Sequence, residues 1–309
     1  MRRLLAISAQ MKATSPVFIV GEARSGTSIL YRTLQKHSSF RPREINLVET
    51  EIFSHLRRTF MFSSSYPRSL VRFMLDDESA HREFIASIRL VRLVNALAIV
   101  PNLLFRDRSD VLWYANLNHF LLRSYFFHAA NARGCRRLVE KTPTNTAHIH
   151  RLWRTFPRAR FLYIHRHPVD VFSSYRRRAR DDPAAGWAER LSPIDFCRTY
   201  ERSVHRVLEW SRGHENLLMV RYEDFTGHPA REFREICEFL GEPFEPQAVR
   251  ESNPDPGRWR GDPHLWGEIV PVTKDWRDHM SWSEADLIQN ALSETMTRLG
   301  YEPYGPSRP

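Results

Sequence analysis

Cysteine is scarce in this sequence, with three residues among 309. Cys135, Cys197 and Cys237 lie in unrelated surroundings, and none of them belongs to a C-x-x-C pair. An odd number of isolated cysteines argues against a disulfide framework and favours a reducing compartment. The sequence therefore predicts a cytoplasmic protein.

Long apolar runs are also missing. The most apolar stretch, residues 90–105, is interrupted by Arg92, Asn95 and Pro101 and is too short to cross a bilayer. The apolar part of residues 1–10 is shorter than the core of a secretory signal peptide. We therefore expect a soluble chain without a membrane span, in which residues 1–10 lead into the first strand.

Acidic residues are outnumbered, with 36 Asp and Glu against 46 Lys and Arg, which gives a net charge of +10. This balance indicates an anionic partner such as a nucleotide, a sulfated or phosphorylated glycan, nucleic acid or an acidic membrane. An arginine-rich surface without any partner explains the charge equally well. No nucleic-acid-binding motif is present and the arginines are scattered, so we expect no nucleic-acid partner.

Short apolar runs alternate with helix-length segments along the chain. The expected strands are residues 17–20, 137–140, 161–165 and 216–221, and the expected helices are residues 26–37, 109–134, 144–156 and 167–180. The strand runs are continuous rather than alternating, which is typical of parallel strands covered on both faces. The pattern predicts a three-layer α/β fold with a central parallel sheet, in which ligands bind at the carboxyl ends of the strands.

Two segments depart from this rhythm. Residues 50–108 contain no clear strand and predict a helical insertion, spanning roughly residues 50–132, that either shapes an acceptor pocket or packs on the sheet. Residues 253–280 are rich in Pro, Gly and Trp and predict a long ordered loop. Neither a linker nor a repeat is evident, so we expect a single domain over residues 1–309.

A glycine-framed loop follows the first expected strand. The frame Gly21-x-x-x-x-Gly26-Thr27-Ser28 has the spacing of a phosphate-binding P-loop, and a strand, tight turn and helix together direct backbone N–H groups at one anion. Arg24 adds a fixed positive charge and a bidentate donor. Thr27 occupies the position of the lysine that grips a triphosphate in P-loop kinases. The loop therefore predicts an anion that needs neither that lysine nor a metal.

A second candidate anion site follows the third expected strand. Arg166 ends this strand, Pro168 opens a helix, and Ser174 lies two turns into that helix on the face of Asp170 and Val171. An arginine at a strand end and a serine on the next helix can bind the same phosphate.

Together these motifs resemble those of sulfotransferases that use 3′-phosphoadenosine 5′-phosphosulfate (PAPS). The stretch GEARSGTS is similar to the 5′-phosphosulfate loop P-[KR]-S-G-T-[ST] of that family, with Ala23 in place of the usual proline. Arg166, Pro168, Asp170 and Ser174 match its 3′-phosphate motif. The segments VRYEDF (220–225) and SETMTRLGYEP (293–303) also resemble the family.

The resemblance implies a P-loop-like fold and a set of residues that bind PAPS. These are Arg24, Ser25, Gly26, Thr27 and Ser28 in the loop, Arg166 and Ser174 for the 3′-phosphate, Tyr222 beside the adenine, and Lys274 closing over the cofactor.

It also implies catalytic groups for transfer to an acceptor hydroxyl. Glu44, in a stretch similar to K-E-[VI]-H, is the expected base, with Glu49 and Glu51 as the alternatives. Lys141, in the stretch EKTP, and Arg24 would stabilise negative charge on the donor side. The implied acceptor is a carbohydrate or a small-molecule or lipid alcohol.

Two other interpretations fit parts of the pattern. An ATP-dependent kinase with a degenerate P-loop would explain the glycine frame, but ATP lacks the 3′-phosphate that Arg166 and Ser174 would bind. The pairs HIH (148–150) and HRH (165–167) suggest metal ligation, yet two ligands without a third do not complete a site. We therefore expect no metal.

Overall fold

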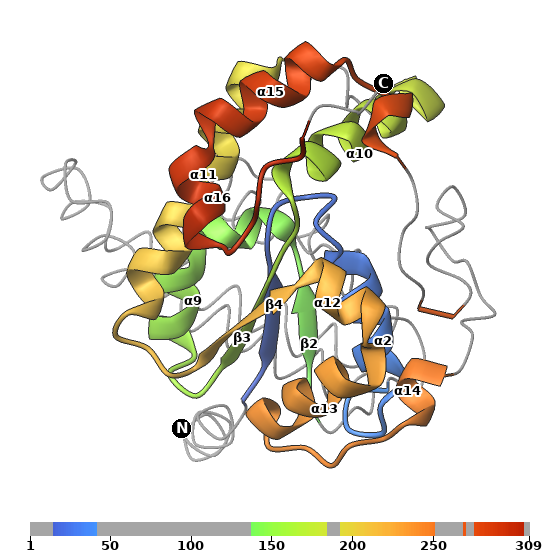
Figure 1. Ribbon diagram of the computed structural model, residues 1–309. Helices are drawn as coiled ribbons and strands as arrows, with labels where there is room; N and C mark the ends of the chain where they lie inside the picture. The colour runs from blue at the N-terminus through green and yellow to red at the C-terminus, as the bar shows by residue number, and fades with distance from the viewer. Residues whose placement is uncertain (1–14, 42–136, 184–191, 251–267, 270–274, 306–309) are drawn as a thin grey trace, which may run out of the picture. The chain divides into compact units, whose positions relative to one another are not determined.

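The computed structural model describes residues 15–41, 137–183, 192–250, 268–269 and 275–305 (Figure 1). Most of the helical insertion, including the expected helix at 109–134, and most of the expected loop at 253–280 lie outside these ranges. The chain divides into two compact units. One comprises Met1–Phe18, Ser38–Glu140 and His148–Arg160, and the other Ile19–His37, Lys141–Ala147 and Phe161–Pro309. The single-domain organisation stays a prediction.

A four-stranded sheet in the order β2-β1-β3-β4 is the centre of the fold. Its strands are β1 (Val17–Val20), β2 (Val139–Lys141), β3 (Arg160–His165) and β4 (Leu217–Arg221). The β3 and β4 strands pair in parallel, with Phe161 opposite Leu217 and His165 opposite Arg221. All of β1 and β2 and most of β3 are buried, which confirms the α/β fold with a buried parallel sheet that the continuous apolar runs predicted.

Several helices of the second unit begin where the sequence supplies capping chemistry. They are α2 (Thr27–Lys36), α10 (Pro168–Asp181), α11 (Pro193–Ser211), α12 (Tyr222–Gly227), α13 (Pro229–Leu240), α14 (Gln247–Arg250), α15 (Trp282–Ala291) and α16 (Ser293–Arg298), with the 3₁₀ turn η6 (Trp276–Asp278). Pro168 and Pro193 occupy the first positions of α10 and α11, where a missing N–H costs no helical hydrogen bond. Ser281 and Glu284 form a reciprocal capping box at the start of α15.

Helix packing in this unit places α15 against both α11 and α10, as Figure 1 shows. Aromatic rings fill the space between α10 and α11, where Phe196 contacts Phe172 and Tyr200. The α12 helix packs on α13, and α14 packs on α2. Among the described helices, none is both long and apolar enough to cross a membrane.

The described part of the first unit is small. It contains α9 (Ile149–Thr155), and the 3₁₀ turn η1 (Pro143–His148) leads into that helix. Phe18 packs against Phe156 with ring centres 5.7 Å apart, and the Ser15 hydroxyl donates to the Arg158 carbonyl oxygen. The expected helix at 144–156 therefore starts as a tighter 3₁₀ turn, because Pro143 and the polar residues after it lack the apolar periodicity of an α-helix.

Candidate functional site

The glycine-framed loop joins β1 to α2. Gly21 and Gly26 have φ values of 151° and 102°, and Arg24, with φ of 70°, is the one non-glycine residue with positive φ in the described ranges. A Cβ atom on Gly21 would collide with the Ile164 carbonyl oxygen of β3, so the loop needs glycine where it passes the sheet. Gly26 caps α2 without a side-chain hydrogen bond, which leaves the first amides of that helix directed at a ligand position.

Ser25 is the clearest sign that the loop is built for a ligand. The residue is fully buried, and within the described ranges its hydroxyl oxygen has no hydrogen-bond partner. A buried hydroxyl without a partner is costly, and an oxyanion would satisfy it. Thr27, which is buried, and Ser28, which is half-buried, follow as the first two residues of α2. The residues present therefore fit an anionic group.

Thr146 fixes the loop to the segment that follows β2. Its hydroxyl oxygen accepts a hydrogen bond from the Gly21 amide at 2.9 Å and lies 2.8 Å from the Pro143 carbonyl oxygen. Lys141 is the last residue of β2 and is fully buried, and its role in the site stays a prediction. Sequence reasoning did not single out Thr146, although its place three residues after Pro143 is typical of a side chain that closes a turn.

Ala23, which departs from the family pattern, has a local compensation. A proline here would have no N–H, whereas the Ala23 amide donates to the Glu22 carboxylate at 3.2 Å. The Tyr175 hydroxyl of α10 donates to the same carboxylate oxygen at 2.8 Å. Glu22 and Tyr175 were both missed by sequence reasoning, and no local pattern identifies a contact between residues so far apart.

The two predicted anion sites meet directly. The Arg24 Nε atom of the loop donates to the Ser174 hydroxyl of α10 at 3.1 Å. The structure thus joins a residue expected at the 5′-phosphosulfate to one expected at the 3′-phosphate. These positions belong to one connected polar cluster.

Arg166, at the end of β3, is held on several sides. Its guanidinium lies over the Tyr222 ring at 4.5 Å, and its Nη2 atom is 3.9 Å from the Asp170 carboxylate. The Tyr200 hydroxyl donates to its carbonyl oxygen at 2.7 Å. In the described part of the chain its buried Nε atom has no hydrogen-bond partner. The guanidinium therefore keeps donor capacity for an anion.

Tyr222, the expected neighbour of adenine, links the two halves of the site. The ring is buried between the Arg166 guanidinium and Gly26. A Cβ atom added to Gly26 would lie 2.8 Å from the Cε2 atom of Tyr222. Contact with adenine stays a prediction. The candidate base Glu44, the alternatives Glu49 and Glu51, and Lys274 lie outside the described residues.

The histidine pair of the HRH stretch has structural partners. Burial lowers the pKa of both His165 and His167 to about 4, so both are neutral at physiological pH. His165 Nδ1 lies 3.0 Å from the Tyr301 hydroxyl, and His167 Nε2 lies 3.2 Å from the Glu302 carbonyl oxygen. Across the described ranges, no group of three or more His, Cys, Asp or Glu residues is placed to hold a metal ion.

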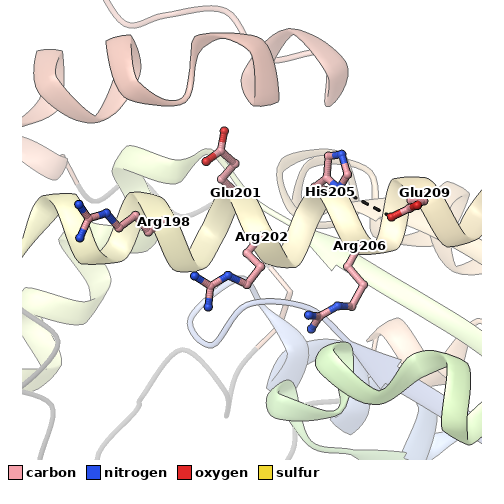
Figure 2. Close-up of a pocket in the computed structure, with 6 residues that line it drawn as sticks. All are labelled: Arg198, Glu201, Arg202, His205, Arg206 and Glu209. Carbon is pink, nitrogen blue, oxygen red and sulfur yellow. Dashed lines mark ion pairs between the residues drawn. The ribbon is translucent and has the colours of Figure 1, made fainter. Parts of the chain in front are cut away.

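A separate surface hollow runs along α11 (Figure 2). Arg198, Arg202 and Arg206 recur every fourth residue along one face of α11. In Figure 2, Arg202 and Arg206 point to the side of the helix opposite Glu201 and His205. The Arg206 guanidinium donates to the Ala147 carbonyl oxygen at 3.4 Å, and Ala147 follows the threonine that holds Gly21. The arginine side of α11 thus ends beside the segment that supports the loop.

Comparisons with known proteins agree with this geometry. The sulfotransferase domain of the Synechococcus PCC 7002 olefin synthase has a similar structure, with a TM-score of 0.56 and 21% identity, over 94% of this chain and 96% of that one. The sulfotransferase STF9 from Mycobacterium avium gives a TM-score of 0.52 at 16% identity, over 98% of this chain and 84% of that one. At such identities these similarities establish the fold.

Sequence relatives are carbohydrate sulfotransferases. Carbohydrate sulfotransferase 1 of Rattus norvegicus is 30% identical over 116 residues, and the Homo sapiens protein of the same name is 29% identical. Each match covers 34% of this chain and 27% of the relative, so the chain matches about a quarter of the length of these proteins. The sequence model of the sulfotransferase family matches residues 16–246. With its glycine-framed loop hydrogen-bonded to the serine of α10, the chain belongs to the sulfotransferase family.

Proposed function

We propose that this protein transfers a sulfuryl group from PAPS to an acceptor hydroxyl. The observation that carries the proposal is the hydrogen bond between Arg24 and Ser174. The 3′- and 5′-substituents of an adenosine lie on one ribose, so a protein that binds both needs two anion sites in close contact. ATP has only the 5′ group and would not need the second site.

The residues of the loop and of α10 would divide the donor between them. The amides at the start of α2, with Arg24 and Ser25 and the hydroxyls of Thr27 and Ser28, would hold the 5′-phosphosulfate. Arg166 and Ser174 would hold the 3′-phosphate. Tyr222 would lie beside the adenine, and Lys274 would close over the cofactor.

The donor supplies an activated sulfuryl group whose leaving group is adenosine 3′,5′-bisphosphate. The acceptor oxygen forms a bond to sulfur as the bond from sulfur to the phosphate oxygen breaks, and the acceptor proton passes to a base. We assign the base to Glu44 and the stabilisation of charge on the bridging oxygen to Lys141, with help from Arg24. The burial of Lys141 at the end of β2 supports its role, because a buried ammonium acts in a medium that screens charge weakly.

A carbohydrate is the acceptor class that we favour over a small-molecule or lipid alcohol. The sequence relatives, which are carbohydrate sulfotransferases, support this choice. The arginine side of α11 adds a second reason, since Arg198, Arg202 and Arg206 would attract a carboxylated or sulfated glycan toward the loop. Replacing Arg198 and Arg202 by Ala should raise KM for an anionic glycan and leave KM for a neutral acceptor unchanged, with Glu201→Gln as the matched control.

A cytoplasmic location is part of the proposal. Cys197 and Cys237 are free and buried, and burial raises the pKa of their thiols to about 11 and about 12. Both thiols therefore stay protonated and weakly reactive at neutral pH, and free thiols are typical of a reducing compartment.

Transfer of radiolabelled sulfate from PAPS tests the function. Carbohydrates, small-molecule alcohols, lipid alcohols and tyrosine peptides should be compared as acceptors, and we expect labelled carbohydrate. Glu44→Ala should abolish transfer while binding of the bisphosphate product survives. Retained turnover would move the base to Glu49 or Glu51, and a wild-type protein that labels none of the four classes would contradict the proposal.

A further inference from the structure

The C-terminal segment that follows α16 lies against the predicted 3′-phosphate site. The Tyr301 hydroxyl donates to one Glu223 oxygen at 3.0 Å, and the other Glu223 oxygen accepts from the His167 amide. The Tyr304 hydroxyl donates to the Asp170 carboxylate at 3.0 Å. Two tyrosines of one segment therefore contact the carboxylate of Asp170, which lies near Arg166, and that of Glu223, which accepts from the residue after Arg166.

Tyr304 is held firmly enough to direct its hydroxyl. Its ring stacks on His167, with ring centres 4.0 Å apart and an angle of 26° between the planes. Trp276 lies nearly parallel to the same ring at 6.2 Å. The Gln289 side chain accepts from the Tyr304 amide and donates to its carbonyl oxygen. Packing and hydrogen bonds thus fix the backbone and the ring of Tyr304.

The Asp170 carboxylate lies between Tyr304 and Arg166 and is closer to the tyrosine than to the arginine. One oxygen, Oδ2, takes part in both contacts, at 3.0 Å from the tyrosine hydroxyl and 3.9 Å from Arg166 Nη2. The longer distance is beyond a hydrogen bond. Arg178 and Asp182, at the other end of α10 and with the same spacing in sequence, approach to 2.8 Å. An arginine and an aspartate four residues apart can therefore bond directly when nothing intervenes.

The protonation states suit this arrangement. The pKa of Asp170 is raised, chiefly by burial, and the nearby Arg166 charge and the Tyr304 hydrogen bond oppose that rise. Burial and the Asp170 charge raise the pKa of Tyr304, so its hydroxyl stays protonated and donates. The tyrosine thus stabilises the carboxylate as an anion that has a partner other than the arginine.

We propose that the Tyr304 hydroxyl is a positioning group that holds the Asp170 carboxylate off the Arg166 guanidinium and keeps that guanidinium available to the 3′-phosphate of the donor. This inference rests on the proposed function, because it assigns the 3′-phosphate to Arg166. Without the hydroxyl, Asp170 Oδ2 loses its donor and closes on Arg166. The carboxylate then competes with the phosphate for the same N–H groups.

Calorimetric binding of two nucleotides tests the proposal. Adenosine 3′,5′-bisphosphate reports on both anion sites, and adenosine 5′-phosphate reports on the loop alone. Tyr304→Phe keeps the ring stacking and removes the hydroxyl. We expect it to weaken bisphosphate binding about tenfold, or about 1.4 kcal/mol. Binding of the 5′-phosphate should not change.

Two further variants separate competition from a general structural effect. Asp170→Asn removes the competing charge, so adding it to Tyr304→Phe should restore bisphosphate affinity. Tyr301→Phe, the matched control, removes a hydroxyl from the same segment that contacts Glu223 instead, and should leave the ratio of the two affinities unchanged.

Several outcomes would overturn the proposal. Equal weakening of both nucleotides by Tyr304→Phe would indicate a structural role, as would an equal change of the ratio in Tyr301→Phe. If Asp170→Asn alone weakens bisphosphate binding as much as Tyr304→Phe does, the carboxylate orients the arginine rather than competing for it. A wild-type protein that binds both nucleotides equally would remove the proposed 3′-phosphate site and this inference with it.

Discussion

Gly26→Ala is the substitution whose effect follows most directly from the geometry of the loop. Gly26 has φ of 102°, a backbone conformation that side chains rarely adopt. An added Cβ would also lie 2.8 Å from the Tyr222 Cε2 atom and 3.2 Å from the Ile164 Cδ1 atom. The Tyr222 ring is buried and lies against Arg166, so it cannot move without disturbing the predicted 3′-phosphate site.

The two costs can be estimated separately. Backbone strain at a disfavoured φ costs about 1–3 kcal/mol. Overpacking against a buried ring adds about 1–3 kcal/mol. Gly26→Ala should therefore lower the free energy of unfolding by roughly 2–6 kcal/mol and weaken binding of adenosine 3′,5′-bisphosphate at least tenfold.

Gly241→Ala provides the matched control. Gly241, at the end of α13, also has positive φ, of 71°, but no atom lies within 4 Å of an added Cβ. It should show only the backbone cost, about 1–2 kcal/mol, with unchanged nucleotide binding. Urea unfolding measures the loss of stability, and calorimetry measures nucleotide binding.

If Gly26→Ala is too unstable to purify, Gly26→Ala/Tyr222→Ala should recover the part of the loss that comes from overpacking. Equal losses of stability in the two glycine variants, with nucleotide binding intact in both, would refute the reasoning.

Three other predictions concern the loop and the two buried histidines His165 and His167. Thr146→Val removes the acceptor of the buried Gly21 amide and should lower stability by about 1–3 kcal/mol in urea unfolding, with weaker bisphosphate binding. Arg24→Lys keeps the charge but loses the planar fork, and calorimetry should show bisphosphate binding weakened about tenfold. His165 and His167 have a folded-state pKa of about 4 against 6.5 when unfolded, so the unfolded chain binds more protons as the pH falls. Thermal unfolding should show stability falling between pH 6.5 and 4, by roughly 3 kcal/mol for each histidine, and His165→Gln should flatten the fall.

The sequence predicted the sheet well because its signals are local. Continuous apolar runs placed β3 and β4 to within one residue, and β2 is displaced from the expected 137–140 to 139–141. Pro168 correctly marked the start of α10. The loop was predicted from the spacing of Gly21 and Gly26, because glycine adopts the positive φ angles of such a turn whatever its surroundings.

Contacts between distant segments could not be predicted in the same way. The bond from Arg24 to Ser174 joins residues 150 positions apart, and that from Tyr175 to Glu22 joins residues 153 apart. Neither pair leaves a local pattern. The contact of Tyr304 with Asp170 is of the same kind. Resemblance identified Arg24 and Ser174 as members of two separate motifs, and only the fold shows that they touch.

The most direct test of the account compares the thermal stability of the protein with adenosine 3′,5′-bisphosphate, with ATP and Mg²⁺, and with short duplex DNA. A ligand at a hundred times its Kd stabilises the folded state by about 2.7 kcal/mol. We predict that the bisphosphate raises the unfolding temperature and that ATP with Mg²⁺ and DNA do not. Stabilisation by ATP with Mg²⁺ but not by the bisphosphate would contradict a site built for the 3′-phosphate and would favour a kinase.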